Sequence, residues 1–236
     1  MTLAEHIQKV QARIAAAAEQ AGRDPSEVTL VAATKVQTSE TIRAAIAAGI
    51  TVCGENRAQE FTQHWQDGAY EGAKVHFIGH LQKNKLKYLV GKVDLIESVD
   101  SEELIRLIDK RAQNLGIVQD ILIEVNIGGE ASKSGVKPEE VEALVALAAS
   151  LPGVEPRGLM AIPPVAQEPG ANRAVFAAMR QLFIDIKGKT YNNKVNIDCL
   201  SMGMSGDFED AIAEGATQVR VGTALFGARP ANRVNG

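Results

Sequence analysis

Lys35 is the residue whose place in the sequence most clearly indicates chemistry, because it ends the apolar run Leu30–Thr34. Apolar surroundings disfavour the ammonium form of a lysine, and the neutral amine is a nucleophile toward carbonyl groups. The alternative is a lysine whose aliphatic stem covers apolar surface while its amine extends into solvent at the end of a strand. The run alone leaves both interpretations open.

Two later segments are rich in glycine and hydroxyl side chains and could bind an anion. They are residues 201–207 (SMGMSGD) and 220–227 (RVGTALFG). Backbone N–H groups at a helix start, together with hydroxyls, bind phosphate, whereas helix caps and tight turns explain either segment taken alone. Because both lie at the ends of the last two apolar runs, together they favour a phosphate site. Its candidate residues are Ser201, Met202, Ser205, Gly222 and Thr223.

Arg220 lies within the last apolar run, where a guanidinium needs a partner because burying an unpaired charge is costly. One interpretation is an ion pair with a carboxylate of the same interior, such as Glu124. The other is a hydrogen-bond donor to the ring nitrogen or the phosphate of a ligand.

Eight apolar, β-prone runs alternate with helical segments and must position these residues. The runs cover residues 29–35, 50–56, 74–79, 93–99, 120–127, 154–162, 196–204 and 217–227. They are continuous rather than alternating, which is typical of parallel strands covered by helices. Eight such units in roughly 200 residues predict an α/β fold with a single (β/α)₈ TIM barrel. A doubly wound open sheet is the alternative, which the even series of units without a composition break disfavours.

An extra helix is predicted before the first strand, where Thr2 and Glu5 form a capping-box pattern. We therefore expect one domain over residues 1–236, with an N-terminal helix in 1–24 and the barrel over 29–227. In a closed barrel the first strand lies beside the eighth, and functional residues follow the carboxyl ends of the strands. Lys35 would then lie near residues 220–223, as a carbonyl ligand that carries a phosphate requires.

Seven motifs, in order, resemble those of the YggS/PROSC-type pyridoxal phosphate homeostasis proteins. They are Thr34-Lys35, Gly54-Glu55-Asn56, Phe77-Ile78-Gly79 with Leu81-Gln82 and Asn84-Lys85, Ser132-Lys133 with Gly135, Gly158-Leu159-Met160, residues 201–205, and Arg220-Val221-Gly222-Thr223 with Phe226-Gly227. No single motif is specific, but the ordered series spans nearly the whole chain. The resemblance implies a fold-type III barrel similar to the N-terminal domain of bacterial alanine racemase.

The resemblance also implies a site for pyridoxal 5′-phosphate (PLP), held on Lys35 as a Schiff base, the internal aldimine. By position, the phosphate would be held by Ser201, Gly222 and Thr223, and Arg220 would face the pyridine nitrogen. Asn56 and Ile78 would border the ring. His80 departs from the family, since many relatives carry proline there; it is either an acid–base group or a surface histidine. Residues 130–135 form either a phosphate or partner surface or a solvated loop.

Two classes of function fit such a site. One is a carrier that buffers or delivers PLP, with PLP-dependent apoenzymes as candidate recipients, and the other is a PLP-dependent amino-acid enzyme such as a racemase. An arginine at the pyridine nitrogen leaves the ring a weaker electron sink. Two-base racemisation needs proton-transfer groups on both faces of the substrate. Lys35 supplies one such group. Because nine residues follow Gly227, we expect no second domain that would supply the other. We therefore expect a monomeric carrier without robust turnover.

The charge and composition of the chain argue against nucleic acid, membranes and metal ions as partners. The net charge is −4, the isoelectric point is about 5.7 and the basic residues are scattered, which gives no electrostatic footprint for nucleic acid or anionic lipid. The sequence has neither a secretory signal nor an apolar stretch of membrane-spanning length, and its histidines have no metal-ligand spacing. Cys53 and Cys199 are predicted to be thiols of a reducing compartment. We therefore expect a cytoplasmic protein.

Overall fold

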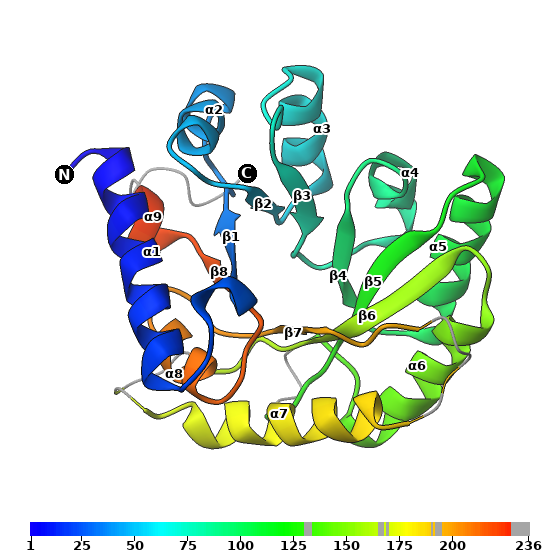
Figure 1. Cartoon of the computed structure of the whole chain (residues 1–236). Coiled ribbons are helices and arrows are strands. Elements are labelled where there is room, and N and C mark those ends of the chain that lie inside the picture. The colour runs from blue at the N-terminus through cyan, green and yellow to red at the C-terminus, as the bar shows by residue number, and fades with distance from the viewer. Residues whose placement is uncertain (130–133, 165–167, 169, 190, 192–194, 228–236) are drawn as a thin grey trace.

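The eight apolar runs form eight parallel strands, which are hydrogen-bonded in chain order and close into a barrel (Figure 1). The computed structural model describes residues 1–129, 134–164, 168, 170–189, 191 and 195–227. Its strands are β1 (Thr29–Ala33), β2 (Val52–Glu55), β3 (Lys74–Phe77), β4 (Leu95–Val99), β5 (Gln119–Glu124), β6 (Val154–Met160), β7 (Cys199–Ser201) and β8 (Gln218–Val221). The barrel closes because β1 pairs in parallel with β8. Thr29 lies opposite Gln218 at one end of this pair, and Ala32 lies opposite Val221 at the other. The predicted barrel is confirmed, and the open sheet is excluded.

Helices surround the barrel and bury its outer face (Figure 1). They are α1 (Leu3–Gln20), α2 (Ser39–Ala47), α3 (Ala58–Gln66), α4 (Leu86–Leu89), α5 (Glu102–Leu115), α6 (Val141–Ser150), α7 (Arg173–Lys187), α8 (Phe208–Ala213) and α9 (Thr223–Phe226). The extra helix α1 begins with the predicted capping box of Thr2 and Glu5. It buries Ile7, Val10 and Ile14 and lies against α8 and α9, so it covers the seam near β8.

Successive strand residues point alternately into the barrel and toward the helices. Ala32 belongs to the large core between barrel and helices, whereas its neighbours Val31 and Ala33 form a separate apolar cluster with Val52 and Ile78. A Cβ added to Gly54 would lie 2.7 Å from Val31 Cγ1, so the interior is tightly filled at this level. Lys35 lies two residues beyond Ala33, in the turn that follows β1.

The two final runs differ from the prediction. The run 217–227 was predicted as one strand, but β8 ends at Val221, because the N–H groups of Leu225 and Phe226 bond back to the carbonyl of Gly222 and start α9. The run 196–204 yields only the short strand β7. Gly203 has a φ of +92°, which turns the chain out of the sheet. In both places, residues that were predicted as strand instead belong to the segments that follow β7 and β8, where the candidate phosphate site is expected.

Candidate functional site

The carboxyl ends of β1, β2 and β3 place three predicted site residues at one end of the barrel. Lys35, Asn56 and Ile78 each follow one of these strands directly. In the sheet, Ala33 lies opposite Gly54 and Glu55 lies opposite Phe77. The three residues therefore lie at the same height along the barrel axis. Lys35 is half-buried there. The structure therefore groups these three residues as the sequence predicted.

The backbone on either side of Lys35 is fixed by buried hydrogen bonds. The Thr34 hydroxyl donates to Glu55 Oε1 at 2.5 Å, and the fully buried Glu55 also accepts from the Tyr70 hydroxyl at 2.9 Å. His64 Nδ1 lies 3.2 Å from the same oxygen, and this hydrogen bond raises the pKa of His64 despite its burial. Lys35 thus follows a residue that has little freedom to move.

Val36, directly after Lys35, has a φ of +60°. A β-branched residue rarely adopts this left-handed conformation, which costs about 1–3 kcal/mol and tends to occur at functional sites. The Val36 N–H donates to Glu60 Oε2 at 3.0 Å, which holds the strained turn. The turn was not predicted, because the sequence gives no signal such as glycine at this position.

Gly79 allows the loops after β2 and β3 to touch. A Cβ at this position would lie 2.0 Å from the carbonyl oxygen of Asn56. The side-chain oxygen Oδ1 of Asn56 is buried and has no hydrogen-bond partner among the described residues. An unpaired buried oxygen is unusual in a folded protein, so this atom suits contact with a ligand.

Ser205 joins the two predicted phosphate loops. Its Oγ accepts hydrogen bonds from the backbone N–H groups of Gly222 at 3.2 Å and Ala224 at 3.3 Å. A further bond runs from the Arg220 N–H to the Gly203 carbonyl at 3.0 Å. The two loops therefore converge, as closure of the barrel predicts. Two amides that meet at one acceptor atom also provide the donor arrangement that a phosphate oxygen requires.

The remaining members of the predicted phosphate set occupy different places. Gly222 packs against β1, since a Cβ there would lie 3.4 Å from Ala33 Cβ, and Thr223 is exposed at the start of α9. The Met202 side chain is buried in the large core outside the barrel, so its backbone is what can face a ligand. The Ser201 hydroxyl is fully buried and already hydrogen-bonded, and its direct contact with a phosphate stays a prediction.

Arg220 points into the barrel and is almost fully buried, with 5% of its surface exposed. Its Nη1 donates to Ser201 Oγ at 2.5 Å, and its Nη2 donates to the Ala161 carbonyl at 2.8 Å. Burial lowers the pKa of the guanidinium, while nearby carboxylates, foremost Glu97, oppose that shift. The ion-pair interpretation of Arg220 named Glu124, but the carboxylate within 4 Å is Glu97, at 3.8 Å.

Sequence reasoning missed two buried acids, Glu55 and Glu97, which support Lys35 and Arg220 respectively. Each interrupts an apolar strand run, in ITVCGEN and VDLIESV. Because an unpaired buried carboxylate is costly, an acid within such a run is itself a signal of a partner inside the protein. A third acid, Glu124, is buried near Arg220; burial and the charge of Asp100 raise its pKa to about 7, against the effect of Arg220.

Two other features of the sequence were candidates for function. His80 is exposed, with Nδ1 3.4 Å from Ser134 Oγ, and lines a surface groove of about 600 Å³ that also includes Asn56. Most of the 130–135 loop, residues 130–133, lies outside the described residues.

Among the helices that the structure describes, none is both long and apolar enough to cross a membrane.

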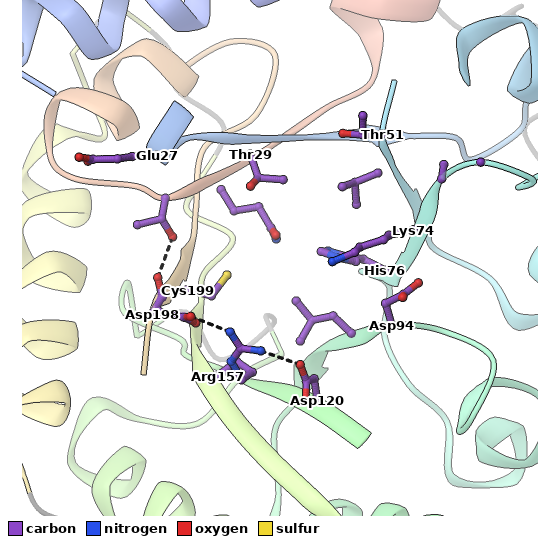
Figure 2. A pocket seen from close by; sticks show the side chains of 16 residues that line it. Glu27, Thr29, Thr51, Lys74, His76, Asp94, Asp120, Arg157, Asp198 and Cys199 are labelled. Carbon is purple, nitrogen blue, oxygen red and sulfur yellow. Dashed lines mark hydrogen bonds and ion pairs between the residues drawn. The ribbon is translucent and has the colours of Figure 1, made fainter. Parts of the chain in front are cut away.

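A cavity of about 780 Å³ opens at the other end of the barrel, where the strands begin (Figure 2). Figure 2 shows Arg157 between two aspartates of its rim, 2.8 Å from Asp120 and 2.6 Å from Asp198. Neither Lys35 nor the two glycine-rich loops line this cavity. Barrel proteins place their ligand chemistry at the carboxyl ends of the strands, so we assign the candidate site to the Lys35 end.

Comparison with known families agrees with this geometry. The alanine racemase N-terminal domain family matches residues 6–230. The chain belongs to this family. It is 46% identical over 229 residues to the pyridoxal phosphate homeostasis protein of Aquifex aeolicus, covering 97% of this chain and 99% of the relative. Its identity to the protein of the same name from Pseudomonas aeruginosa is 44%, over 97% and 96% of the two chains. The resemblance stated from the motifs is thereby confirmed.

Solved structures extend the comparison. PipY of Synechococcus elongatus with PLP bound is 32% identical, with a TM-score of 0.83 over 96% of this chain and 100% of that one. The crystal structure of an unknown protein from Bifidobacterium adolescentis is 40% identical, with a TM-score of 0.86 over 95% and 94% of the two chains. An alanine racemase from Clostridium difficile, 16% identical, shares the fold with a TM-score of 0.72 over 98% of this chain and 59% of its own.

Proposed function

We propose that this protein binds PLP at the Lys35 end of the barrel and serves intracellular PLP homeostasis. The observation that carries the proposal is the convergence of the Lys35 strand end with the paired loops joined by Ser205. The Lys35 amine and the backbone N–H groups of Gly222 and Ala224 at the same end of the barrel support this proposal. The names of the relatives from Aquifex aeolicus and Pseudomonas aeruginosa, and the PLP-bound PipY structure, support the same cofactor.

Lys35 would hold the cofactor covalently as a Schiff base. The neutral form of its amine would supply the bond to the aldehyde carbon of PLP, with the carbonyl oxygen lost as water. The backbone of Lys35 is fixed by Thr34 and by the Val36 turn, so the amine is held in one region of the site. Restricting a reacting group in this way reduces the entropy lost when the bond forms.

The phosphate would bind at the two joined loops, and the ring would lie between them and Asn56. Gly222 and Ala224 supply N–H groups whose present acceptor is Ser205 Oγ, and Thr223 adds a hydroxyl at the start of α9. Asn56 Oδ1 and Ile78 would border the ring. Arg220 would donate to the pyridine nitrogen, which keeps that nitrogen unprotonated because the guanidinium retains its proton.

We further propose that the protein is a cytoplasmic, monomeric carrier that buffers PLP or delivers it to apoenzymes. An unprotonated pyridine stabilises negative charge on a bound amino acid weakly, which favours storage over turnover. PLP-dependent enzymes are the recipients that this role requires.

Titration of the apoprotein with PLP tests the binding step. Formation of the Schiff base changes the absorption spectrum of the aldehyde, so wild-type protein should give a saturable new band. Lys35→Ala should abolish this band. Lys74→Ala is the matched control, because Lys74 is a strand lysine at the opposite end of the barrel and should leave the band unchanged. Equal bands from wild type and Lys35→Ala would refute the covalent assignment.

A second assay separates carrier from enzyme. PLP-loaded protein is incubated with single enantiomers of amino acids, and stereochemical exchange and decarboxylation are followed. We expect no turnover at ordinary enzyme rates, which are about 1–1,000 per second. Turnover in that range would replace the carrier by a racemase or decarboxylase.

A further inference from the structure

Glu97 is a charged group at the centre of the barrel that the proposed binding steps do not use. Its side chain is fully buried on β4 and accepts three hydrogen bonds. Gln218 Nε2 donates to Oε1 at 2.6 Å, His76 Nδ1 donates to Oε1 at 2.9 Å, and the Ser201 hydroxyl donates to Oε2 at 2.6 Å. Residues from three strands, β3, β7 and β8, therefore fix the orientation of this one carboxylate.

The contacts of Glu97 continue directly to Arg220. Ser201 Oγ gives its hydrogen to Glu97 and accepts Arg220 Nη1 at 2.5 Å, while Nη1 lies 3.8 Å from Glu97 Oε2. The Ala161 carbonyl holds the other nitrogen, Nη2. The direction in which the guanidinium points is thus set by Glu97, through Ser201, together with Ala161.

Glu97 is also the permanent counter-charge of this arginine. Three carboxylates, Glu97, Glu124 and Asp207, act on the buried guanidinium. Burial raises the pKa of Glu97, but the hydrogen bonds of His76 and Ser201 and the charge of Arg220 together lower it below its ordinary value. Glu124 instead has a pKa of about 7 and is partly protonated at neutral pH. Since an unpaired buried charge is expensive, Arg220 depends on Glu97.

We propose that Glu97 is a positioning residue of the PLP site, which fixes Arg220 and Ser201 from inside the barrel so that the guanidinium can meet the pyridine ring. The inference rests on the proposed function. It assigns to Glu97 no contact with the cofactor: Glu97 acts through Arg220, and His76 and Gln218 hold Glu97 itself.

A double-mutant cycle with Glu97→Gln and Arg220→Gln tests the proposal by PLP affinity. Each single variant should weaken PLP binding at least about tenfold, which corresponds to ~1.4 kcal/mol. The double variant should bind no worse than the weaker single variant, because both substitutions remove the same contact. Glu97→Asp keeps the charge and should bind PLP more tightly than Glu97→Gln. Wild-type affinity in Glu97→Gln, or losses that add in the double variant, would overturn the proposal.

The same cycle measured by urea unfolding of the apoprotein gives a readout that needs no cofactor. Each single substitution should lower the unfolding midpoint, and the double variant should lose less than the sum. If Glu97→Gln alone does not fold, recovery of a folded double variant supports the proposal, and failure to recover overturns it. Absence of PLP binding by the wild type would instead refute the proposed function, while this stability cycle would still test the Glu97–Arg220 contact.

Asp109→Asn is the matched control for burial. Asp109 is a buried carboxylate on α5 that accepts the Gly153 N–H at 2.7 Å, outside the barrel. Its substitution should lower stability and leave the affinity for PLP within about twofold of wild type. An equal loss of PLP affinity in Asp109→Asn would show that general destabilisation, rather than Arg220, explains the effect of Glu97→Gln.

Discussion

Glu124→Gln should make the protein more stable at high pH and leave it little changed at low pH. Burial and the charge of Asp100 raise the pKa of Glu124 from 4.5 to about 7. An acid whose pKa is higher in the folded state binds more protons folded than unfolded between these two values, so stability falls as pH rises through this window. At 1.36 kcal/mol per pKa unit, a rise of about 2.5 units corresponds to a loss of ~3 kcal/mol.

Urea unfolding of wild type and Glu124→Gln at a series of pH values measures this directly. Glutamine cannot ionise, so the stability difference in favour of the variant should grow by ~3 kcal/mol between about pH 4.5 and about pH 8. Glu71→Gln is the control for the loss of one carboxylate, because Glu71 is exposed. A difference for Glu124→Gln that stays constant, or that grows toward low pH, would show that folding does not raise the pKa of Glu124.

Two further substitutions test the loops of the site. Gly79→Ala should lower the unfolding free energy by ~3 kcal/mol or more and weaken PLP binding, because its Cβ would lie 2.0 Å from the Asn56 carbonyl oxygen. Gly128→Ala is the control and should be tolerated, because its Cβ meets nothing closer than 3.9 Å. Equal stability of the two variants in urea unfolding would contradict this prediction. Ser205→Ala removes the hydroxyl that joins the two loops and should speed PLP release about fivefold in a dissociation assay, since one hydrogen bond is worth roughly 1 kcal/mol. An unchanged release rate would remove Ser205 from the phosphate site.

The barrel could be predicted from the sequence because its strands are buried on both faces. Such strands appear as continuous apolar runs, and eight evenly spaced runs leave few alternatives. The convergence of Lys35 with the loops at residues 201–207 and 220–227 followed from closure alone, since β1 must then lie beside β8. Global topology therefore placed the main candidate residues correctly without knowledge of any side-chain contact.

The details that the sequence did not disclose depend on contacts between distant residues. That Glu97, rather than Glu124, lies within 4 Å of Arg220 is decided by the register of β4 and β8 within the barrel, which no local pattern encodes. The left-handed turn at Val36 is held by Glu60 on α3 and runs against local preference. The end of β8 at Val221 was missed because the apolar residues of α9 continue the strand pattern.

Borohydride reduction followed by peptide mapping identifies the lysine that bonds to PLP. Protein incubated with PLP is reduced, which converts the C=N bond into a stable amine, and is then digested and analysed by mass spectrometry. We expect a single phosphopyridoxyl adduct on the peptide that contains Lys35, and none in Lys35→Ala. A reduced adduct at another lysine, or one that persists undiminished in Lys35→Ala, would contradict this expectation.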